Sequence, residues 1–320
     1  MSLTLPDKWI WDSWFVRDGE TVHAFYLHAS RALHNPDRRH HHAIVGHATS
    51  TDLTNWSVTA DALIVSEPGS FDDGTTWTGS AVKDDNGLWW MFYTGTSLAE
   101  DRLVQRIGAA TSTDLTTWTK VSTEPLVQAD SRYYEVLSAT PGRHGAWKEE
   151  CWRDPWVFRA NDSAQWQMLI TGRANTGDIE GRGVLAHATS DDLLNWTVGL
   201  PLSGPNEGFG HLEVFQYAEV DGVPIILFSC AASELSAERI AAGEAGGIYS
   251  LVVDRKLTHI DFTHAIEFDR PELYAARLVQ DNVGAWNLIG FINEIDGMFI
   301  GSLSDPIPVT ATELRGVIPA

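Results

Sequence analysis

Residues Gly46–Val58 read GHATSTDLTNWSV, and the same pattern returns at Gly108–Lys120 (GAATSTDLTTWTK) and at Ala186–Val198 (AHATSDDLLNWTV). Each copy begins with alternating small and apolar residues, passes through a Ser/Thr-Asp-Leu turn, and reaches a Trp that opens a further stretch. Alternation with a period of two predicts a β-strand, and the turn residues predict a tight reversal after it. The pattern therefore predicts a repeated strand–turn–strand unit.

Extended, aromatic-rich runs precede these copies, at His23–His28, Leu88–Thr94 and Trp166–Thr171. Two weaker units follow, led by Pro224–Cys230 and Trp286–Ile292. Five repeated units of several strands each are typical of a propeller, in which radial repetition buries both faces of every small sheet. We therefore predict an all-β fold, a single five-bladed β-propeller over residues 1–320 with an axial active-site pocket.

The expected blades follow from where each repeat begins and ends. We predict a short helix or a loop at Ala231–Ala245, within the fourth repeat. The Trp residues of the three clear repeats, Trp56, Trp118 and Trp196, are expected to pack between blades. The predicted blades are Trp9–Ala60, Trp77–Ser122, Trp152–Leu200, Leu212–Phe262 and Pro271–Pro306.

The composition of the chain limits the kinds of partner that it can bind. The formal net charge of -21 argues against nucleic acid and against an anionic membrane surface as partners, because both attract basic patches. The 14 Trp residues exceed what the core of such a chain needs, and flat half-polar rings are good platforms for the C–H faces of sugars. A neutral small oligosaccharide is the expected partner, and the oligomeric state stays open.

Segments that direct a chain elsewhere are not visible. The N-terminal stretch lacks a basic start followed by an apolar run, and Val223–Ala232 is too short for a membrane span, so we expect a cytoplasmic protein. The two Cys residues, Cys151 and Cys230, are expected to be buried reduced thiols. Neither a phosphate-binding loop nor a nucleotide fingerprint occurs, and we predict no cofactor and no metal site.

Three carboxylates lie inside predicted inner strands that are otherwise apolar: Asp12 (WIWDSWF), Asp154 (CWRDPWVF) and Glu213 (HLEVFQ). Burying an acid in such a strand is costly without compensation, which favours a functional role. Glycosidic cleavage needs one protonated acid for the leaving oxygen and one ionised carboxylate that attacks the sugar or activates water. We therefore predict these three as the catalytic residues of a glycosidase.

Other residues near these strands are candidates for substrate contacts. Strand alternation places Trp14 beside Asp12, and Trp156 beside Asp154, on the pocket side. Arg153 would then point away from the pocket unless a β-bulge re-aims it. The substrate-binding candidates are Trp14, Trp77, Ser80, Arg153, Trp156 and His211.

Three other groups of titratable residues are assigned structural roles and no catalytic ones. His40–His42 follows a turn-forming stretch and predicts an exposed loop near the pocket mouth, in preference to a metal site. Glu149 and Glu150 precede the third inner strand and are expected to be solvated loop acids. Asp52, Asp114 and Asp192 occupy the repeated turn and are expected to cap it.

The chain resembles the five-bladed β-fructosidase and arabinosidase superfamily, which includes glycoside hydrolase families 32 and 68 and the related families 43 and 62. The resemblance rests on Trp11-Asp12-Ser13-Trp14, Trp77-Thr78-Gly79-Ser80, Arg153-Asp154-Pro155 and Glu213, in that blade order. It implies a β-fructofuranosidase in which Asp12 is the nucleophile, Asp154 the transition-state stabiliser and Glu213 the acid/base.

The chain also departs from the family 32 pattern. The Trp-x-Asn-Asp-Pro-Asn nucleophile motif is absent, and Val214 stands where a Cys usually follows the Glu. The chain ends soon after the fifth repeat, which predicts no C-terminal β-sandwich. Three alternatives stay open: fructosyl transfer, an inverting arabinofuranosidase or xylosidase of the family 43 type, and a non-catalytic glycan-binding propeller.

Overall fold

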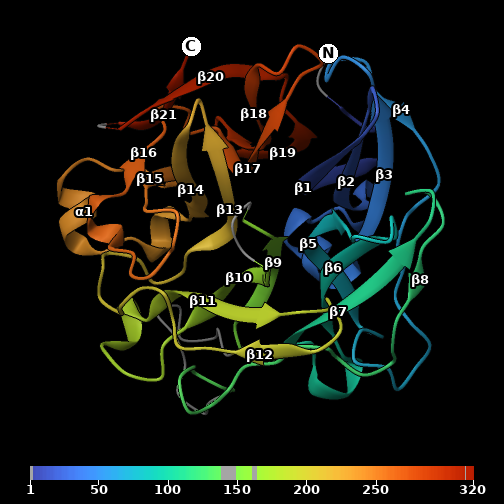
Figure 1. Cartoon of the computed structure of the whole chain (residues 1–320), viewed down its shortest axis with the longest axis horizontal. Helices are drawn as coiled ribbons and strands as arrows, with labels where there is room; N and C mark the ends of the chain where they lie inside the picture. The colour runs from blue at the N-terminus through green and yellow to red at the C-terminus, as the bar shows by residue number, and fades with distance from the viewer. Residues whose placement is uncertain (1–2, 138–148, 161–163, 314) are drawn as a thin grey trace.

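The computed structural model describes residues 3–137, 149–160, 164–313 and 315–320. Five antiparallel sheets surround a common axis, as Figure 1 shows, and one propeller accounts for every strand of the described residues. Four sheets have four strands in sequence order, and the fifth has five strands, with order β17-β18-β20-β21 and β19 paired to β18. The predicted five-bladed propeller is confirmed.

The first strand of each sheet lies nearest the axis and the last lies at the periphery (Figure 1). Blades one and two comprise β1 (Lys8–Asp18), β2 (Thr21–Ser30), β3 (Ile44–Ser50) and β4 (Ser57–Val58), then β5 (Thr75–Lys83), β6 (Trp89–Thr96), β7 (Gln105–Ser112) and β8 (Thr119–Lys120). Blades three and four comprise β9 (Trp152–Phe158), β10 (Trp166–Arg173), β11 (Gly183–Ser190) and β12 (Trp196–Val198), then β13 (Glu213–Val220), β14 (Val223–Cys230), β15 (Gly247–Val252) and β16 (Ile266–Glu267). Blade five comprises β17 (Leu273–Gln280), β18 (Trp286–Ile295), β19 (Met298–Leu303), β20 (Ile307–Thr312) and β21 (Gly316–Pro319).

Helical turns are confined to the loops that join the strands. The one α-helix of the described residues, α1 (Ala237–Ala241), lies inside the segment for which a short helix or a loop was predicted. The 3-10 turns are η1 (Arg31–Leu33), η2 (Pro36–His42), η3 (Leu98–Glu100), η4 (Ile179–Gly181), η5 (Ala232–Glu234) and η6 (Phe262–His264).

Two blades extend further than the repeats predicted. The outer strand of blade four, β16, lies beyond the expected end at Phe262, and blade five continues past Pro306 through β20 and β21. These outer strands lack the Ser/Thr-Asp-Leu-x-x-Trp signature of the first three blades, so the sequence offered no marker for them.

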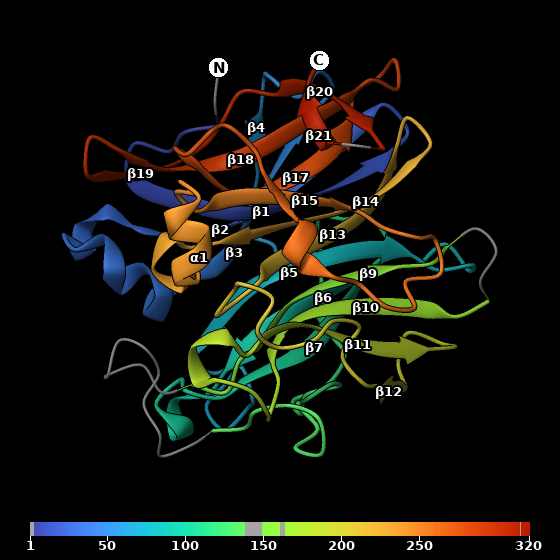
Figure 2. The same cartoon turned by 90° about the vertical axis from the view of Figure 1, so that its left-hand side faces the viewer.

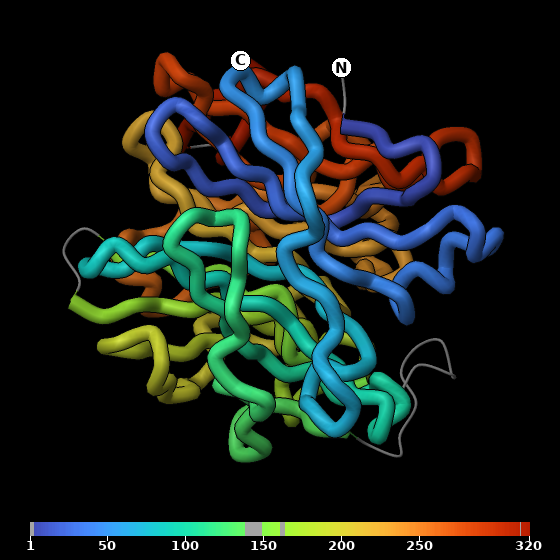
Figure 3. Tube along the Cα trace, turned by 90° about the vertical axis from the view of Figure 1, so that its right-hand side faces the viewer, coloured from blue at the N-terminus to red at the C-terminus, as the bar shows by residue number. Residues whose placement is uncertain are grey.

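The ring closes where the first and last blades meet. The amide of Leu303 donates to the carbonyl of Leu3 at 3.0 Å, and Nη2 of Arg31 donates to the carbonyl of Ile300 at 2.9 Å. Figures 2 and 3 show the last strands, in red, beside the first strand, in dark blue. Closure leaves the inner strands of all five blades around one axis.

The repeated turn has the role that was expected of it. Oδ1 of Asp52 accepts the amides of Thr54 and Asn55 at 2.9 and 2.7 Å, and Asp114 and Asp192 repeat this geometry. In each copy the indole N–H of the Trp donates to the carbonyl of the Leu three residues earlier, at 3.0–3.2 Å. The motif is therefore a self-contained structural unit at the outer edge of the blade.

The core lies between neighbouring blades. Trp118 of blade two packs edge-on against Phe25 of blade one, and Trp196 of blade three packs edge-on against Phe92 of blade two. Trp56 instead contacts Phe15 within its own blade. The packing role of these Trp residues is confirmed, with Trp56 as a contact inside one blade.

Both Cys residues, Cys151 and Cys230, are free and buried, as the sequence predicted. Burial raises the pKa of both thiols, so they contribute as small apolar groups. Across the described ranges, no helix has the length and hydrophobicity of a membrane span.

Candidate active site

A β-bulge interrupts the inner strand of every blade at a corresponding position. The pairing register slips at Trp11/Ser13 in β1 and at Trp77/Gly79 in β5, and corresponding slips occur in β9, β13 and β17. At four of the five bulges a residue has positive φ: Asp12 (32°), Asp154 (58°), Val214 (57°) and Ala275 (46°). A bulge adds one residue to a strand and re-aims the neighbouring side chains, so simple alternation fails here.

The bulges turn two consecutive residues of a strand toward the axis. A cavity of about 1020 Å³ opens there; in the first four blades it is lined by the residue at the bulge and the residue just before it, and in the fifth by the residue just before the bulge. Those residues are Trp11 and Asp12, Trp77 and Thr78, Arg153 and Asp154, Glu213 and Val214, and Tyr274. The three predicted carboxylates therefore line one cavity, although they come from three blades.

Asp12 lies in the floor of this cavity. Oγ1 of Thr78 donates to its Oδ2 at 2.5 Å. Burial is the main cause that raises the pKa of Asp12 to about 6, and the charge of Glu213 acts in the same direction. The hydrogen bond from Thr78 and the positive charges of Arg39 and Arg277 oppose that rise. Asp12 is therefore mostly ionised near neutral pH and hydrogen-bonded on one oxygen.

Asp154 is the most enclosed of the three, with 3% of its surface exposed. Its Oδ2 accepts from Oγ1 of Thr171 at 3.0 Å and from the amide of Val214 at 3.3 Å. Burial raises the pKa of Asp154 to about 7, which Arg153 opposes and the negative charges of Asp12 and Glu213 reinforce. The side chain is thus held by neighbouring strands in a fixed orientation toward the cavity.

Glu213 is held at both carboxylate oxygens. Nη2 of Arg153 donates to Oε1 at 2.5 Å, and the hydroxyl of Tyr274 donates to Oε2. The glutamate side chain is 22% exposed, against 4% for the side chain of Asp154. An accessible carboxyl with a fixed orientation is suited to exchanging a proton with a group that enters the cavity.

Arg153 lines the cavity, where alternation alone would have turned it away. The bulge at Asp154 re-aims it, which is the condition that the sequence reasoning had set for a role in the pocket. Its Nη1 donates to Gln105 at 3.0 Å and to Glu149 at 2.9 Å, and its Nη2 lies 3.1 Å from Nδ1 of His211. The guanidinium is therefore fixed from several sides as it meets the carboxylates.

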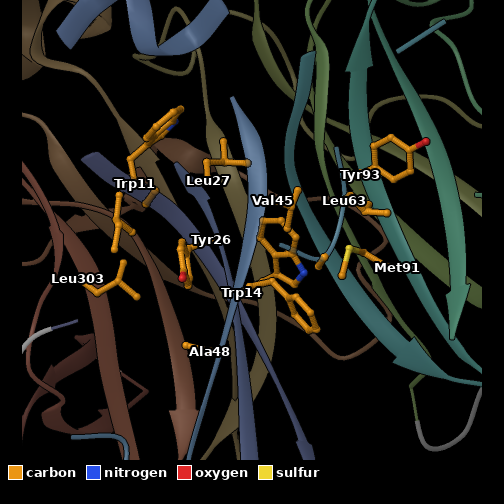
Figure 4. Close-up of a cluster of buried hydrophobic side chains, with 14 of the residues drawn as sticks. Trp11, Trp14, Tyr26, Leu27, Val45, Ala48, Leu63, Met91, Tyr93 and Leu303 are labelled. Carbon is orange, nitrogen blue, oxygen red and sulfur yellow. The ribbon is translucent and has the colours of Figure 1, made fainter. Parts of the chain in front are cut away.

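Of the Trp residues predicted to contact substrate, one lines the cavity and another lies in the core. Trp77 lines the cavity, and its Nε1 donates to the carbonyl of His40 at 2.8 Å. Trp14 is fully buried in the core of blade one, stacked on Phe25, and Figure 4 shows it beside Val45. Trp14 therefore offers no face to a sugar, which corrects the prediction from alternation.

Three further substrate-contact candidates lie outside the cavity lining. The ring of Trp156 lies against the guanidinium of Arg277, with 4.7 Å from Cζ to the ring centroid. Ser80 is buried and accepts the amide of Val157 at 2.9 Å. His211 is buried and reaches the site through Arg153. None of these three is among the residues that line the cavity, so they pack behind its wall.

One loop assignment also changes. Glu149 was expected to be a solvated acid, but its side chain is 7% exposed, pairs with Arg153, and lines the cavity. Glu149, Cys151 and His211 offer ligand atoms within 4.8 Å of one another, which is metal-like spacing. Arg153 hydrogen-bonds with all three, so a cation already fills that position. The residues present therefore do not fit a metal ion.

The loop expected near the pocket mouth is confirmed, whereas Tyr274 was not predicted. The short turn η2 forms part of the mouth through Asp37, Arg39, His40 and His41, as the expected loop near the mouth. No carboxylate marks the inner strand of blade five, which is why Tyr274 was not predicted. A lone Tyr and a lone Arg in the apolar run LYAARLV were the available signal.

Comparison with known proteins places these features in context. The family model described as "Glycosyl hydrolases family 32 N-terminal domain" matches residues 6–299. A fructan 1-exohydrolase of Hordeum vulgare is 27% identical over 154 residues, which is 48% of this chain and 22% of the relative. The chain thus spans less than a quarter of that relative's length.

Solved structures share the fold along almost the whole chain. An inulosucrase of Halalkalicoccus jeotgali bound to kestose superimposes with a TM-score of 0.78 and 21% identity, covering 98% of this chain and 88% of that one. A Bombyx mori β-fructofuranosidase superimposes with a TM-score of 0.73 and 20% identity, covering 100% of this chain and 64% of the other. At these identities the likeness concerns the fold.

Proposed function

Because the chain belongs to glycosyl hydrolase family 32, we propose that it hydrolyses small β-fructofuranosides with retention of configuration at the anomeric carbon. Membership decides the choice of family that the sequence left open, in favour of family 32 over families 68, 43 and 62. The observation that carries the proposal is the meeting of Asp12, Asp154 and Glu213 in one cavity, with Arg153 bonded to the third.

Asp12 is the proposed nucleophile. Its pKa of about 6 leaves it largely ionised near neutral pH, and the hydrogen bond from Thr78 occupies Oδ2, so Oδ1 is the oxygen that attacks the anomeric carbon. The bond that forms joins this oxygen to the sugar, and the glycosidic bond breaks with its electron pair on the leaving oxygen.

Glu213 is the proposed acid/base. It gives its proton to the leaving oxygen while Arg153 and Tyr274 hold its carboxyl group in place. Formation of the fructosyl ester leaves Glu213 ionised, because its proton has gone to the leaving oxygen. Glu213 then takes a proton from water, which attacks the ester and releases fructose.

Asp154 is the proposed stabiliser of the transition state. Positive charge develops on the furanose ring as the glycosidic bond breaks, and a carboxylate fixed by Thr171 and the amide of Val214 lies ready to oppose it. Such a group accepts hydrogen bonds from ring hydroxyls without reorganising during the reaction.

Trp77 is the proposed platform for a sugar ring, since it lines the cavity beside Asp12. The cavity volume of about 1020 Å³ accommodates a di- or trisaccharide and favours small substrates over polymers.

The experiment that tests this function is sugar release from a panel: sucrose, a levan-type and an inulin-type fructo-oligosaccharide, and aryl arabinofuranoside and xyloside. Asp12→Asn and Glu213→Gln serve as matched, isosteric controls. We expect fructose release that both substitutions reduce by about 100-fold or more. Release of pentose, or turnover that survives both substitutions, would overturn the proposal.

The stereochemistry has its own readout. NMR of the first product formed shows the β-anomer of fructose for retention and the α-anomer for inversion. Excess sucrose as acceptor separates transfer from hydrolysis, because transfer yields trisaccharide while hydrolysis yields free fructose.

A further inference from the structure

Arg277 is a buried cation beneath the floor of the cavity. It belongs to β17, is 1% exposed, and is not part of the cavity lining. Removing a guanidinium from water costs several kcal/mol unless its surroundings compensate. The rest of this strand, LYAA before Arg277 and LVQ after it, is mostly apolar, so a charge there does not improve its packing. The contacts of the Arg277 guanidinium must therefore compensate for its burial.

The hydrogen bonds of Arg277 go to the backbone of two other blades. Nε donates to the carbonyl of Ser13 at 3.2 Å, and Nη1 donates to the carbonyls of Val214, at 3.1 Å, and Phe215. Ser13 directly follows Asp12, and Val214 directly follows Glu213. One side chain thus holds the bulged segments that carry two of the three carboxylates.

Val214 connects this contact to the third carboxylate. Its carbonyl accepts from Arg277 while its amide donates to Oδ2 of Asp154 at 3.3 Å. Val214 has positive φ (57°), a conformation that a β-branched residue adopts only when its surroundings impose it. Arg277 is one of the groups that contact Val214 in this conformation.

The guanidinium also stacks on the Trp156 ring, with 4.7 Å from Cζ to the centroid. Its Nη2 finds no hydrogen-bond partner within the described part of the chain. The contacts therefore fix the plane of the guanidinium. Its positive charge is only partly compensated by the backbone carbonyls that accept its hydrogen bonds.

The remaining charge acts on the carboxylates above it. Arg277 interacts electrostatically with Asp12 and Asp154. The other charged and titratable groups that act on Asp12 are Arg39 of η2, Asp154 of β9, Glu213 of β13 and Tyr274 of β17.

We propose that Arg277 is a positioning residue for the reaction: it holds the backbone at Asp12 and Glu213 in register and supplies a fixed positive charge beneath the carboxylates. The part that concerns the reaction rests on the proposed fructosidase function. The positive charge of Arg277 and its contacts with the backbone do not depend on that function, so they are tested by a measurement other than turnover.

The test combines NMR titration with kinetics on three variants. Protein labelled with ¹³Cγ-aspartate reports the titration of Asp12, whose signal is assigned by its loss in Asp12→Asn. Arg277→Met removes the charge and the carbonyl contacts, whereas Arg277→Lys keeps the charge. Arg239→Met is the matched control, because Arg239 is also a buried guanidinium, bonded to the carbonyl of Phe262 at 2.7 Å and stacked on Phe209.

In Arg277→Met we expect the Asp12 midpoint to rise by about one pH unit, because an opposing positive charge is lost. We expect kcat/KM for fructose release to fall about 100-fold. Arg277→Lys should keep the wild-type midpoint with a reduced kcat, and Arg239→Met should change thermal stability alone.

An unchanged Asp12 midpoint in Arg277→Met, or an equal shift in Arg239→Met, would overturn the charge role. If Arg277→Met does not fold, Arg277→Lys still decides the positioning role, because a wild-type kcat there would contradict it. If the wild-type protein releases no fructose, the proposed function fails, and the titration still reports on Arg277.

Discussion

Arg153 and Glu213 lie 60 residues apart in the sequence, and a hydrogen bond of 2.5 Å from Nη2 to Oε1 joins them across neighbouring blades. The same guanidinium lies 3.6 Å from Oδ2 of Asp154, measured from Nε. A single cation therefore links the proposed acid/base to the proposed stabiliser. Its forked shape allows this, since each guanidinium nitrogen can meet a different acceptor.

Arg153→Lys is expected to lower kcat/KM by about 10- to 100-fold while the protein stays folded. Lysine keeps the charge but offers a single nitrogen, which cannot meet Glu213, Gln105 and His211 together. Steady-state kinetics on the preferred fructoside, with circular dichroism as the folding check, measure the effect. A lysine variant with wild-type kcat/KM would show that charge alone suffices and that the fork has no role.

The pH dependence of kcat/KM follows from Asp12 and Asp154. Burial raises the pKa of Asp12 to about 6 and that of Asp154 to about 7, and both carboxyl groups must be ionised for the reaction, so kcat/KM is expected to fall as the pH drops from about 7 to below about 6. Thr78→Val removes the hydrogen bond to Oδ2, which favours the ionised form, and should move this acid limb to higher pH. An acid limb near pH 4 in the wild-type protein would contradict this assignment.

Asp154 should lower the stability of the folded protein at high pH. Its pKa is about 7 in the folded protein and 3.8 for an ordinary solvated aspartate, so between these values the folded protein holds a proton that the unfolded chain releases. Stability from this group is therefore lost as the pH rises from about 4 to about 7. Asp154→Asn, which does not titrate, should be more stable than wild type by roughly 1–3 kcal/mol at about pH 8.

Urea unfolding at about pH 4 and at about pH 8 checks this sign. The gain in the free energy of unfolding should be present at the higher pH and small at the lower one. An equal gain at both values would mean that Asn changes packing and that ionisation of Asp154 is not the cause.

The propeller could be predicted because its repeats leave marks that survive in one sequence. The Ser/Thr-Asp-Leu turn and its Trp recur in three blades, since each turn makes the same local hydrogen bonds at Asp52, Asp114 and Asp192. Blades four and five lack this turn, and their outer strands were placed too early for that reason.

The acidic residues of the site could be predicted from the sequence, whereas the directions in which the side chains of the inner strands point could not. A carboxylate in an apolar strand is visible in the sequence, as Asp12 and Asp154 are. A β-bulge is not visible, because positive φ at Asp12 or Ala275 follows from how five strands converge and from no local residue preference. Alternation alone therefore assigned Trp14 to the pocket and Arg153 away from it, and the structure reverses both.

Tyr274→Phe tests how the acid/base is held. The hydroxyl donates to Oε2 of Glu213, and its loss leaves that oxygen without this partner. We expect a fall in kcat of about 10-fold on sucrose, whose leaving group needs protonation. An aryl fructoside has a better leaving group and should be affected less. An equal loss on both substrates would place Tyr274 in binding and not in proton transfer.

Substitutions of Trp14 and Trp77 by Ala distinguish a Trp that stabilises the core from a Trp that lines the cavity. Trp14→Ala removes a fully buried indole and should cost about 3–5 kcal/mol in the free energy of unfolding, with KM close to wild type in the protein that folds. Trp77→Ala removes a cavity wall and should raise KM by about 2- to 10-fold with a smaller loss of stability. Denaturant unfolding and initial rates on both variants decide the matter. A raised KM in Trp14→Ala, with little loss of stability, would mean that Trp14 contacts the substrate, because loss of a core residue does not selectively weaken sugar binding.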